Sequence, residues 1–328
     1  MTSIHDVAAL AKVSIKTVSR VVNKAPNVSP ELRDRVQAAI EQLGYRPNQS
    51  ARRLAGGRSF MIAFLYNNPA PGYVSRIQIG AAWRCRELGY HLVVEPISHG
   101  GEERFEVLDR LVAALRPDGV LLVPPLSDDP GLLARLVEMG LPYARIAGSG
   151  KEGGFTIETP ERAGGRMVAD HLIALGHRRI GVITPPSTHH AAQHRVEGFR
   201  DGLAAAGLPV EEDLFLQGRF DFASGIEAGE ALLALPQPPS AIFATNDEMA
   251  LGVLTLAHNI GLRVPEDLSV AGFDDTTASH TSWPPLTTVR QPLEDMGRRV
   301  IDALAKGPAE GAGFEFTLIE RGSSGPPS

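Results

Sequence analysis

The chain of 328 residues has very little cysteine and no long apolar segment. Cys85 is the single cysteine, so no disulfide can form within the chain, which suits a reducing cytoplasm. No segment is long and apolar enough to predict a membrane span. Because the first residues lead directly into a polar, capped helix, we also expect no export signal. These absences argue against secreted scaffolds and membrane proteins and favour a cytoplasmic protein.

Positive charge is scarce in most of the chain but concentrated at its start. Residues 1–60 hold ten basic and four acidic residues, a net charge of +6, whereas the whole chain carries -6. The remainder therefore carries -12. A basic segment joined to an acidic body fits a protein that docks on a phosphate backbone with one end only. Taken alone, such an imbalance is equally consistent with a solvated surface.

A helix-turn-helix pattern occupies this basic segment. A first helix is predicted from Ile4 to Ala11, and Ser3 with Asp6 forms a capping-box-like start. Ser14 supplies the cap of a second helix with a buried valine face. The outward positions of that helix are Ile15, Lys16, Thr17, Ser19 and Arg20. A recognition helix presents such positions to the major groove of DNA.

A third helix completes a small all-α head. Ser29 and Pro30 mark its start, and Gly44 marks its end. Three helices of this size bury only a small core, so the head is expected to be marginally stable alone.

Apolar runs and amphipathic stretches alternate through the rest of the chain. Strand-like segments lie at 60–66, 91–95, 119–123, 143–147, 179–184, 241–245 and 268–273. Helix-like stretches lie at 76–88, 102–115, 164–175, 196–206 and 247–259. This alternation predicts two doubly wound, mostly parallel sheets. Ligands of such sheets bind beyond the carboxyl ends of the strands, so two facing lobes should form a ligand-binding cleft.

Four motifs resemble one known family. The stretches 4–23, 28–29, 43–48 and 51–56 look like the head of the lactose repressor (LacI/GalR) family of bacterial transcription regulators, and the match continues to about residue 321. The resemblance implies an α/β body of two lobes like that of periplasmic binding proteins. It also implies a helix-turn-helix head over 1–46, a hinge helix and linker over 47–59, and an effector-binding and dimerisation domain over 60–328. Within that domain, the N-lobe would span about 60–158 and 291–321, and the C-lobe about 159–290.

The resemblance also implies which residues contact DNA. The positions are Ser14, Ile15, Lys16, Thr17, Ser19, Arg20, Asn23, Asn48, Ala51 and Leu54. Arg20 is the favoured base reader, because an arginine can bond bidentately to guanine. Leu54 falls where the family's hinge helix inserts a leucine into the minor groove. The alternative is a core leucine on a short linker helix, since Ala51 and Leu54 are three residues apart.

The family's effector positions transfer unevenly. They fall here on Tyr73, Ser75, Arg195, Phe220, Asn246, Asp274 and Gln291. Phe222 is an alternative to Phe220 as the aromatic residue that stacks on a sugar ring. For Asp247 and Asp275, helix capping and lobe packing are the favoured interpretation.

Two departures from the family pattern leave the ligand undefined. Ala147 stands where the family often has an acid or amide, and the pair at 159–160 is Thr-Pro where an Asp-Asn type pair is common. Both changes remove polar partners from the cleft. Side chains that could compensate are Arg145, His189, His190 and His194. For the three histidines, surface exposure is the favoured interpretation.

Other chemistry finds little support. The glycine-rich turn at 147–152 lacks the residues of a phosphate-binding loop. His190 and His194 have the four-residue spacing of a helical metal pair, but no third metal ligand is evident. We therefore expect no metal or cofactor. A sugar-binding transport protein would share the two lobes but carry an export signal and no DNA head. A carbohydrate-active enzyme would need carboxylates paired across a bond, with Asp274 and Glu248 as candidates.

The favoured function is a sequence-specific DNA-binding regulator rather than an enzyme. We expect a repressor that binds double-stranded DNA at a near-palindromic operator as a homodimer, with a carbohydrate effector as inducer. The tail at 321–328 is rich in glycine, serine and proline and has no leucine heptads, so we expect it to be flexible and expect no tetramer.

Overall fold

The computed structural model describes residues 2–22, 28–45, 58–98, 100–149, 153–308 and 313–328. It divides into two compact units, residues 1–59 and 60–328. Each unit has its own hydrophobic core. No helix in the described parts of the chain combines the length and the apolar character needed to cross a membrane.

The first unit contains three helices whose ends are fixed by local capping. They are α1 (Ile4–Ala11), α2 (Ile15–Val22) and α3 (Pro30–Leu43). The capping box of Ser3 and Asp6 is present, and Ser29 accepts a hydrogen bond from the amide of Leu32 at the start of α3. The side chains of Val7, Val18 and Val36 are fully buried between the helices. The predicted all-α head is therefore confirmed.

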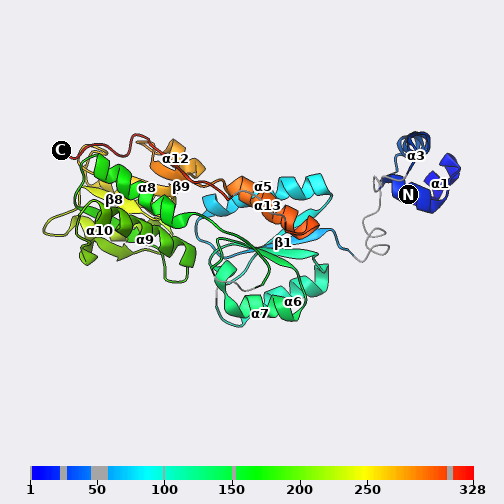
Figure 1. Ribbon diagram of the computed structural model, residues 1–328, viewed down its shortest axis with the longest axis horizontal. Helices are drawn as coiled ribbons and strands as arrows, with labels where there is room; N and C mark the ends of the chain where they lie inside the picture. Colours follow the sequence, from blue (N-terminus) through cyan, green and yellow to red (C-terminus); the bar gives the residue numbers. More distant parts are fainter. Residues whose placement is uncertain (1, 23–27, 46–57, 99, 150–152, 309–312) are drawn as a thin grey trace. The chain divides into compact units, whose positions relative to one another are not determined.

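The first lobe of the body is a parallel sheet with helices on both faces (Figure 1). Its order is β2 (His91–Pro96), β1 (Met61–Tyr66), β3 (Gly119–Leu122), β4 (Tyr143–Ile146) and β5 (Phe155–Ile157). One face carries α5 (Pro71–Leu88) and α13 (Leu293–Lys306), and the other carries α6 (Glu103–Leu115) and α7 (Pro130–Glu138). The strands β1, β3 and β4 are buried on both faces, as expected for parallel sheets.

The second lobe repeats this plan with an added antiparallel edge. Its order is β11 (Thr317–Ile319), β10 (Thr287–Arg290), β9 (Ser269–Asp274), β8 (Ala241–Ala244), β6 (Ile180–Thr184) and β7 (Phe215–Gln217). Its helices are α8 (Glu161–Ala174), α9 (His190–Ala205), α10 (Phe222–Leu233), α11 (Asp247–Asn259) and the short α12 (Thr277–Thr281). The helices α8 and α9 cover one face, and α10 and α11 cover the other. Two doubly wound lobes were predicted, and the structure confirms them.

Glycines set the close packing of three helix pairs. A Cβ atom on Gly165 of α8 would overlap the backbone of Arg195 in α9, and one on Gly198 of α9 would overlap the backbone of Arg162 in α8. The pairs α5–α13 and α10–α11 show the same reciprocal arrangement, through Gly80 with Gly297 and Gly225 with Gly252. Any side chain at these positions would force the helices apart.

The structure corrects the predicted course of the last residues. The segment 291–321 was assigned to the first lobe; α13 packs on that lobe as predicted, but β11 pairs with β10 in the sheet of the second lobe. The tail was expected to be flexible, yet Ser323 is fully buried and its hydroxyl donates to the carbonyl of Val270 at 2.6 Å. The amide of Gly325 donates to the Ser269 hydroxyl at 3.0 Å. Polar contacts rather than apolar residues fix this tail, which is why composition alone misjudged it.

Candidate ligand cavity and nucleic-acid interface

A cavity lies between the two lobes of the body. Residues of both lobes line it: Asn68, Ala70, Tyr73, Pro124 and Ala147 from the first lobe, and Glu161, His189, Ala191, Ala192, Arg195, Phe220, Asn246 and Asp274 from the second. Its mixture of apolar walls with a few polar groups is typical of small-molecule sites.

Several helices begin at this cavity. Ala70 precedes the first residue of α5, Glu161 is the first residue of α8, and His189 precedes α9. Asn246 caps α11 by accepting a hydrogen bond from the amide of Met249 at 3.0 Å. Phe220 lies two residues before α10. Helix N-termini present unpaired amide groups and partial positive charge, so the cavity walls favour negative or hydrogen-bond-accepting groups.

Arg195 is the central cation of the cavity. Its guanidinium donates through Nε to Glu161 Oε2 at 2.5 Å and through Nη1 to the carbonyl of Thr245 at 2.7 Å. The guanidinium carbon lies 3.9 Å from the ring centre of Phe273, which holds the group flat. Among the described residues, its Nη2 atom finds no acceptor, so that edge of the guanidinium can serve a ligand.

Asp274 supplies the opposing acceptor. Its Oδ1 atom accepts from Gln291 Nε2 at 2.6 Å and lies 3.6 Å from Arg195 Nη1. Burial raises the pKa of Asp274 well above the ordinary value of 3.8, although the nearby guanidinium of Arg195 opposes that shift. In the described part of the chain no donor reaches Oδ2, so hydroxyl groups of a ligand would satisfy this atom and favour the ionised carboxylate.

Aromatic groups close two further walls. Tyr73 is buried, and burial together with the charges of Glu161 and Asp274 raises the pKa of its phenol, which therefore stays protonated and able to donate. The rings of Phe220 and His189 meet edge to face with 4.7 Å between their centres. The burial of His189 contradicts its predicted surface exposure.

Backbone strain is concentrated at the same cavity. Ala147, Phe220 and Asp274 have positive φ angles of 52°, 63° and 118°, and all three line the cavity. Non-glycine residues adopt such angles at a free-energy cost that the surrounding structure must offset, and they cluster at ligand sites.

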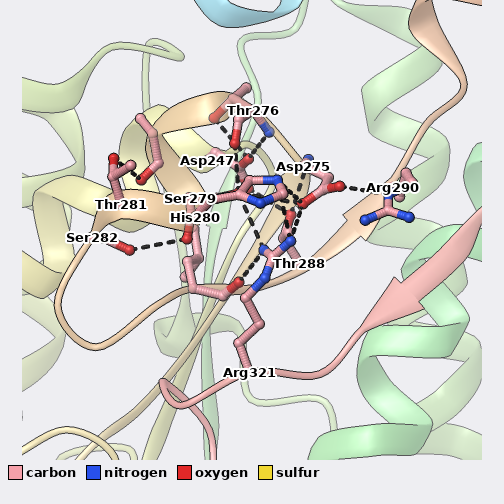
Figure 2. Close-up of polar contacts among 12 residues, drawn as sticks. Asp247, Asp275, Thr276, Ser279, His280, Thr281, Ser282, Thr288, Arg290 and Arg321 are labelled. Carbon is pink, nitrogen blue, oxygen red and sulfur yellow. Dashed lines mark hydrogen bonds and ion pairs between the residues drawn. The ribbon is translucent and has the colours of Figure 1, made fainter.

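A second polar network centres on Asp247 and Asp275 (Figure 2). Asp247 accepts hydrogen bonds from the amide and hydroxyl of Thr276 at 2.7 and 3.0 Å and from the Thr288 hydroxyl at 2.6 Å. Asp275 accepts from Arg290 Nε at 2.6 Å and from Arg321 Nη2 at 2.5 Å. Asp247 and Asp275 thus pack the lobe, as was predicted for both.

The structure separates the predicted effector residues into three groups. Tyr73, Arg195, Phe220, Asn246 and Asp274 line the cavity. Gln291 lies behind it and orients Asp274. Ser75 is an exposed residue of α5 that bonds to the carbonyl of Gly72, so it does not face the cleft.

The other candidate ligand contacts lie away from the cavity. Phe222, the alternative to Phe220, is 40% exposed on α10, and His190 and His194 are exposed. Arg145 is fully buried, but it donates to Thr156, Ser127 and Ser149. It therefore does not replace the polar partners that the cleft lacks.

Glu161 is the lining residue that sequence reasoning missed. It directly follows the Thr159-Pro160 pair that departs from the family pattern, and it brings a carboxylate back to the cleft. The only available signal was an acid at the start of a helix, directly after a proline. Such an acid is more often a simple helix-terminus charge.

The recognition helix α2 presents the surface that was predicted. Ile15, Lys16 and Arg20 are exposed, and Thr17 and Ser19 are partly exposed. Ser14 accepts a hydrogen bond from the amide of Thr17 at 3.2 Å, which caps the helix. The other predicted contact residues, Asn23, Asn48, Ala51 and Leu54, lie outside the described residues.

A basic helix-turn-helix head joined to a two-lobed body with an enclosed cavity defines a ligand-responsive DNA-binding regulator. Residues 3–48 match the model of bacterial regulatory proteins of the lacI family, and residues 169–324 match the periplasmic binding protein-like domain. The chain is 38% identical to the HTH-type transcriptional regulator CelR of Thermobifida fusca over 302 residues, which is 90% of this chain and 88% of the relative. The chain belongs to the LacI family, and it is a transcription regulator rather than an enzyme.

Solved structures show the same architecture over nearly the whole chain. A CelR–cellobiose complex superposes with a TM-score of 0.71 at 34% identity, covering 98% of this chain and 100% of the other. The Lac repressor dimer bound to operator and the anti-inducer ONPF superposes with a TM-score of 0.80 at 31% identity, covering 99% of each chain. The predicted resemblance, the fold class and the function as a regulator are confirmed.

Proposed function

We propose that this chain represses transcription as a homodimer on a near-palindromic operator, and that a carbohydrate bound in the cavity sets its affinity for DNA. The observation that carries this proposal is the constellation of Arg195, Asn246 and Asp274 beside the ring of Phe220. Fixed donors and acceptors next to an aromatic face suit a ring that carries several hydroxyl groups. The cellobiose complex of CelR supports the same ligand class.

The DNA-binding part of the proposal rests on the exposed face of α2 and on sequence. Arg20 and Lys16 would read bases or phosphates in the major groove. Residues 1–46 would form the head and 47–59 the hinge, where Leu54 would act as a minor-groove wedge. Residues 60–328 would bind effector and a second subunit. Since operators are reached only inside the cell, the protein would act in the cytoplasm.

Exposed apolar side chains support the dimer. Trp83 on α5 is 55% exposed and Trp283 is 91% exposed. A groove beside Trp283 is lined by Phe222, Leu251, Leu254, Thr255, His258, Ala278, Thr281 and Ser282. Contiguous apolar surface of this kind marks protein interfaces, and the Lac repressor neighbour is a dimer.

The cavity lies where ligand binding would change the fit between the lobes. Tyr73 belongs to the first lobe and Arg195 to the second, so a ligand that contacts both favours one relative position of the lobes. Coupling between effector and operator would amount to about 1–3 kcal/mol and must be reciprocal. An inducer would therefore bind more weakly in the presence of operator.

The first step of the test is a selection of DNA sites from random oligonucleotides with the full chain. The enriched site is then titrated in gel shifts with and without mono- and disaccharides, including cellobiose. We expect a near-palindromic site and at least one sugar that lowers operator affinity about 5- to 150-fold. Arg195→Ala should keep operator binding and lose the sugar response. No enriched site, or a normal sugar response in Arg195→Ala, would reject the proposal.

Sedimentation of wild type and Trp283→Asp tests the dimer, since only the variant should be monomeric.

A further inference from the structure

The charges lining the cavity are unequal in number. Arg195 is its one guanidinium among the described lining residues, and Glu161 and Asp274 are two carboxylates. The side chains of Glu161, Asp274 and Arg195 are only 2%, 4% and 7% exposed. In so enclosed a place, charge interactions are screened far less than at the surface.

Without Glu161, the same walls would form an anion site. The N-termini of α5, α8, α9 and α11 meet here, and helix N-termini favour anions. A buried arginine at the same point adds a full positive charge and a forked set of donors suited to phosphate or carboxylate.

Glu161 occupies this position. Its Oε2 atom accepts from Arg195 Nε at 2.5 Å, and as the first residue of α8 it also lies in the favourable field of that helix. The glycine contacts between α8 and α9 hold the two helices close enough for the pair to form. The carboxylate of the protein thus fills the place that the anionic group of a ligand would take.

We propose that Glu161 makes this cavity selective against anionic ligands, so that its natural ligand is uncharged and polyhydroxylated and not a sugar phosphate or sugar acid. The proposal rests on the function assigned to the cavity above. An anionic ligand would place further negative charge beside a guanidinium that Glu161 already pairs. A neutral polyol instead accepts from Arg195 Nη2 and donates to Asp274 Oδ2 without adding charge.

The proposal predicts a new activity in a single variant. Glu161→Gln keeps the size of the side chain but removes its charge, which leaves Arg195 and the helix N-termini to bind an anion. The probe is sodium phosphate at pH 7.5, compared with sodium chloride of equal ionic strength, and the readouts are thermal unfolding and calorimetric titration of the full chain. In wild type, phosphate should raise the unfolding midpoint by less than about 1 °C. In Glu161→Gln the rise should reach about 3 °C, and phosphate should bind at least about tenfold more tightly.

A matched control separates this effect from general anion binding. Glu212 forms a two-bond pair with Arg200 at the surface, at 2.6 and 2.8 Å, with 73% of the Glu212 side chain exposed. Glu212→Gln also frees an arginine, but one in contact with water, so phosphate should have no specific effect. Glu161→Ala, measured alongside, should gain phosphate binding as Glu161→Gln does.

Two results would overturn the proposal. In the first, the Glu161 variants fold but bind phosphate no more tightly than wild type. In the second, wild type binds phosphate and Arg195→Gln abolishes that binding. The phosphate titration of wild type can still overturn the proposal if the Glu161 variants fail to fold. Operator titrations of the same samples without phosphate keep the two proposals apart. Loss of wild-type operator binding rejects the proposed function, whereas the phosphate results reject only the role of Glu161.

Discussion

Asp274 and Asp275 are consecutive residues whose carboxylates serve different parts of the molecule. Asp274 lines the ligand cavity, whereas Asp275 is held by Arg290 and Arg321 in the second polar network (Figure 2). Both have positive φ angles, 118° and 53°, which turn the backbone so that the side chains diverge. The carbonyl of Asp275 also accepts from Arg76 Nη1 of α5 at 3.0 Å. A ligand that contacts Asp274 therefore acts on a backbone segment tied to both lobes.

Loss of the Asp275 carboxylate should destabilise the body strongly. Asp275→Asn removes the buried negative charge that two arginines share and replaces one acceptor oxygen with an amino group, and breaking a buried pair on one side costs about 3–5 kcal/mol. We expect a loss of about 3 kcal/mol in the free energy of unfolding, because Arg290 is half exposed and can be solvated. Urea unfolding measures it. Asp295→Asn, at an exposed residue of α13, is the control and should change stability by less than about 0.5 kcal/mol. Equal stability of the two variants would contradict the prediction.

Asp247 should make stability depend on pH. Burial raises the pKa of Asp247 from 3.8 to about 7, so the folded state holds this proton more tightly than the unfolded state does. The stabilising contribution is complete below pH 4 and is lost as the pH rises to about 7. The difference in unfolding free energy between wild type and Asp247→Asn should therefore fall across this range. Urea unfolding at pH 5, 6, 7 and 8 measures the difference, and a value that is constant or rises with pH would contradict the assignment.

Gly198 should tolerate no side chain. Gly198→Ala forces α9 away from the backbone of α8 at Arg162, and such overpacking costs about 1–3 kcal/mol or more. It should also lengthen the Glu161–Arg195 contact and weaken the sugar response. Gly313→Ala is the matched control, because nothing lies within 4 Å of the added carbon and the backbone angle is ordinary. If both variants unfold at the wild-type temperature, the close packing is not required.

In the head, binding and stability should separate. Arg20 is exposed and Val18 is fully buried, although both belong to α2. Arg20→Ala should weaken operator binding by about 1–3 kcal/mol and leave the unfolding of the head unchanged. Val18→Ala should lower head stability by about 1–2 kcal/mol through the loss of two buried methyl groups. Gel shifts at fixed salt measure operator binding, and far-ultraviolet circular dichroism of the full chain measures unfolding. Wild-type operator affinity in Arg20→Ala would show that Arg20 does not contact DNA.

The sequence predicted the capped helices of the head and most of the buried strands, because caps and apolar periodicity are local signals. It placed the starts of three body helices too late. The predicted starts were residues 76, 164 and 196, whereas α5, α8 and α9 begin at Pro71, Glu161 and His190. These first turns place Tyr73, Glu161, Ala191 and Ala192 at the cavity, and their glycine, proline and polar residues interrupt any apolar stripe.

The same error hid part of the candidate site. Tyr73 was identified only through the family resemblance, and Glu161 was missed although it pairs with the predicted Arg195. The short strands β5, β7 and β11 have three residues each, which is too few for a periodic pattern. Their positions depend on contacts between segments distant in the chain, such as the pairing of Arg290 with Thr317.

The pairing of α5 with α13 has a consequence for biosynthesis. The helix α13 packs on β3, β4 and β5, yet it leaves the ribosome about 200 residues after α5. At roughly 5–20 residues per second, this interval lasts about 10 to 40 s. During that time one apolar face of the first sheet lacks its second covering helix, and the nascent chain is most open to aggregation and to chaperone binding. The first lobe to be synthesised therefore stays incomplete until most of the second has been made.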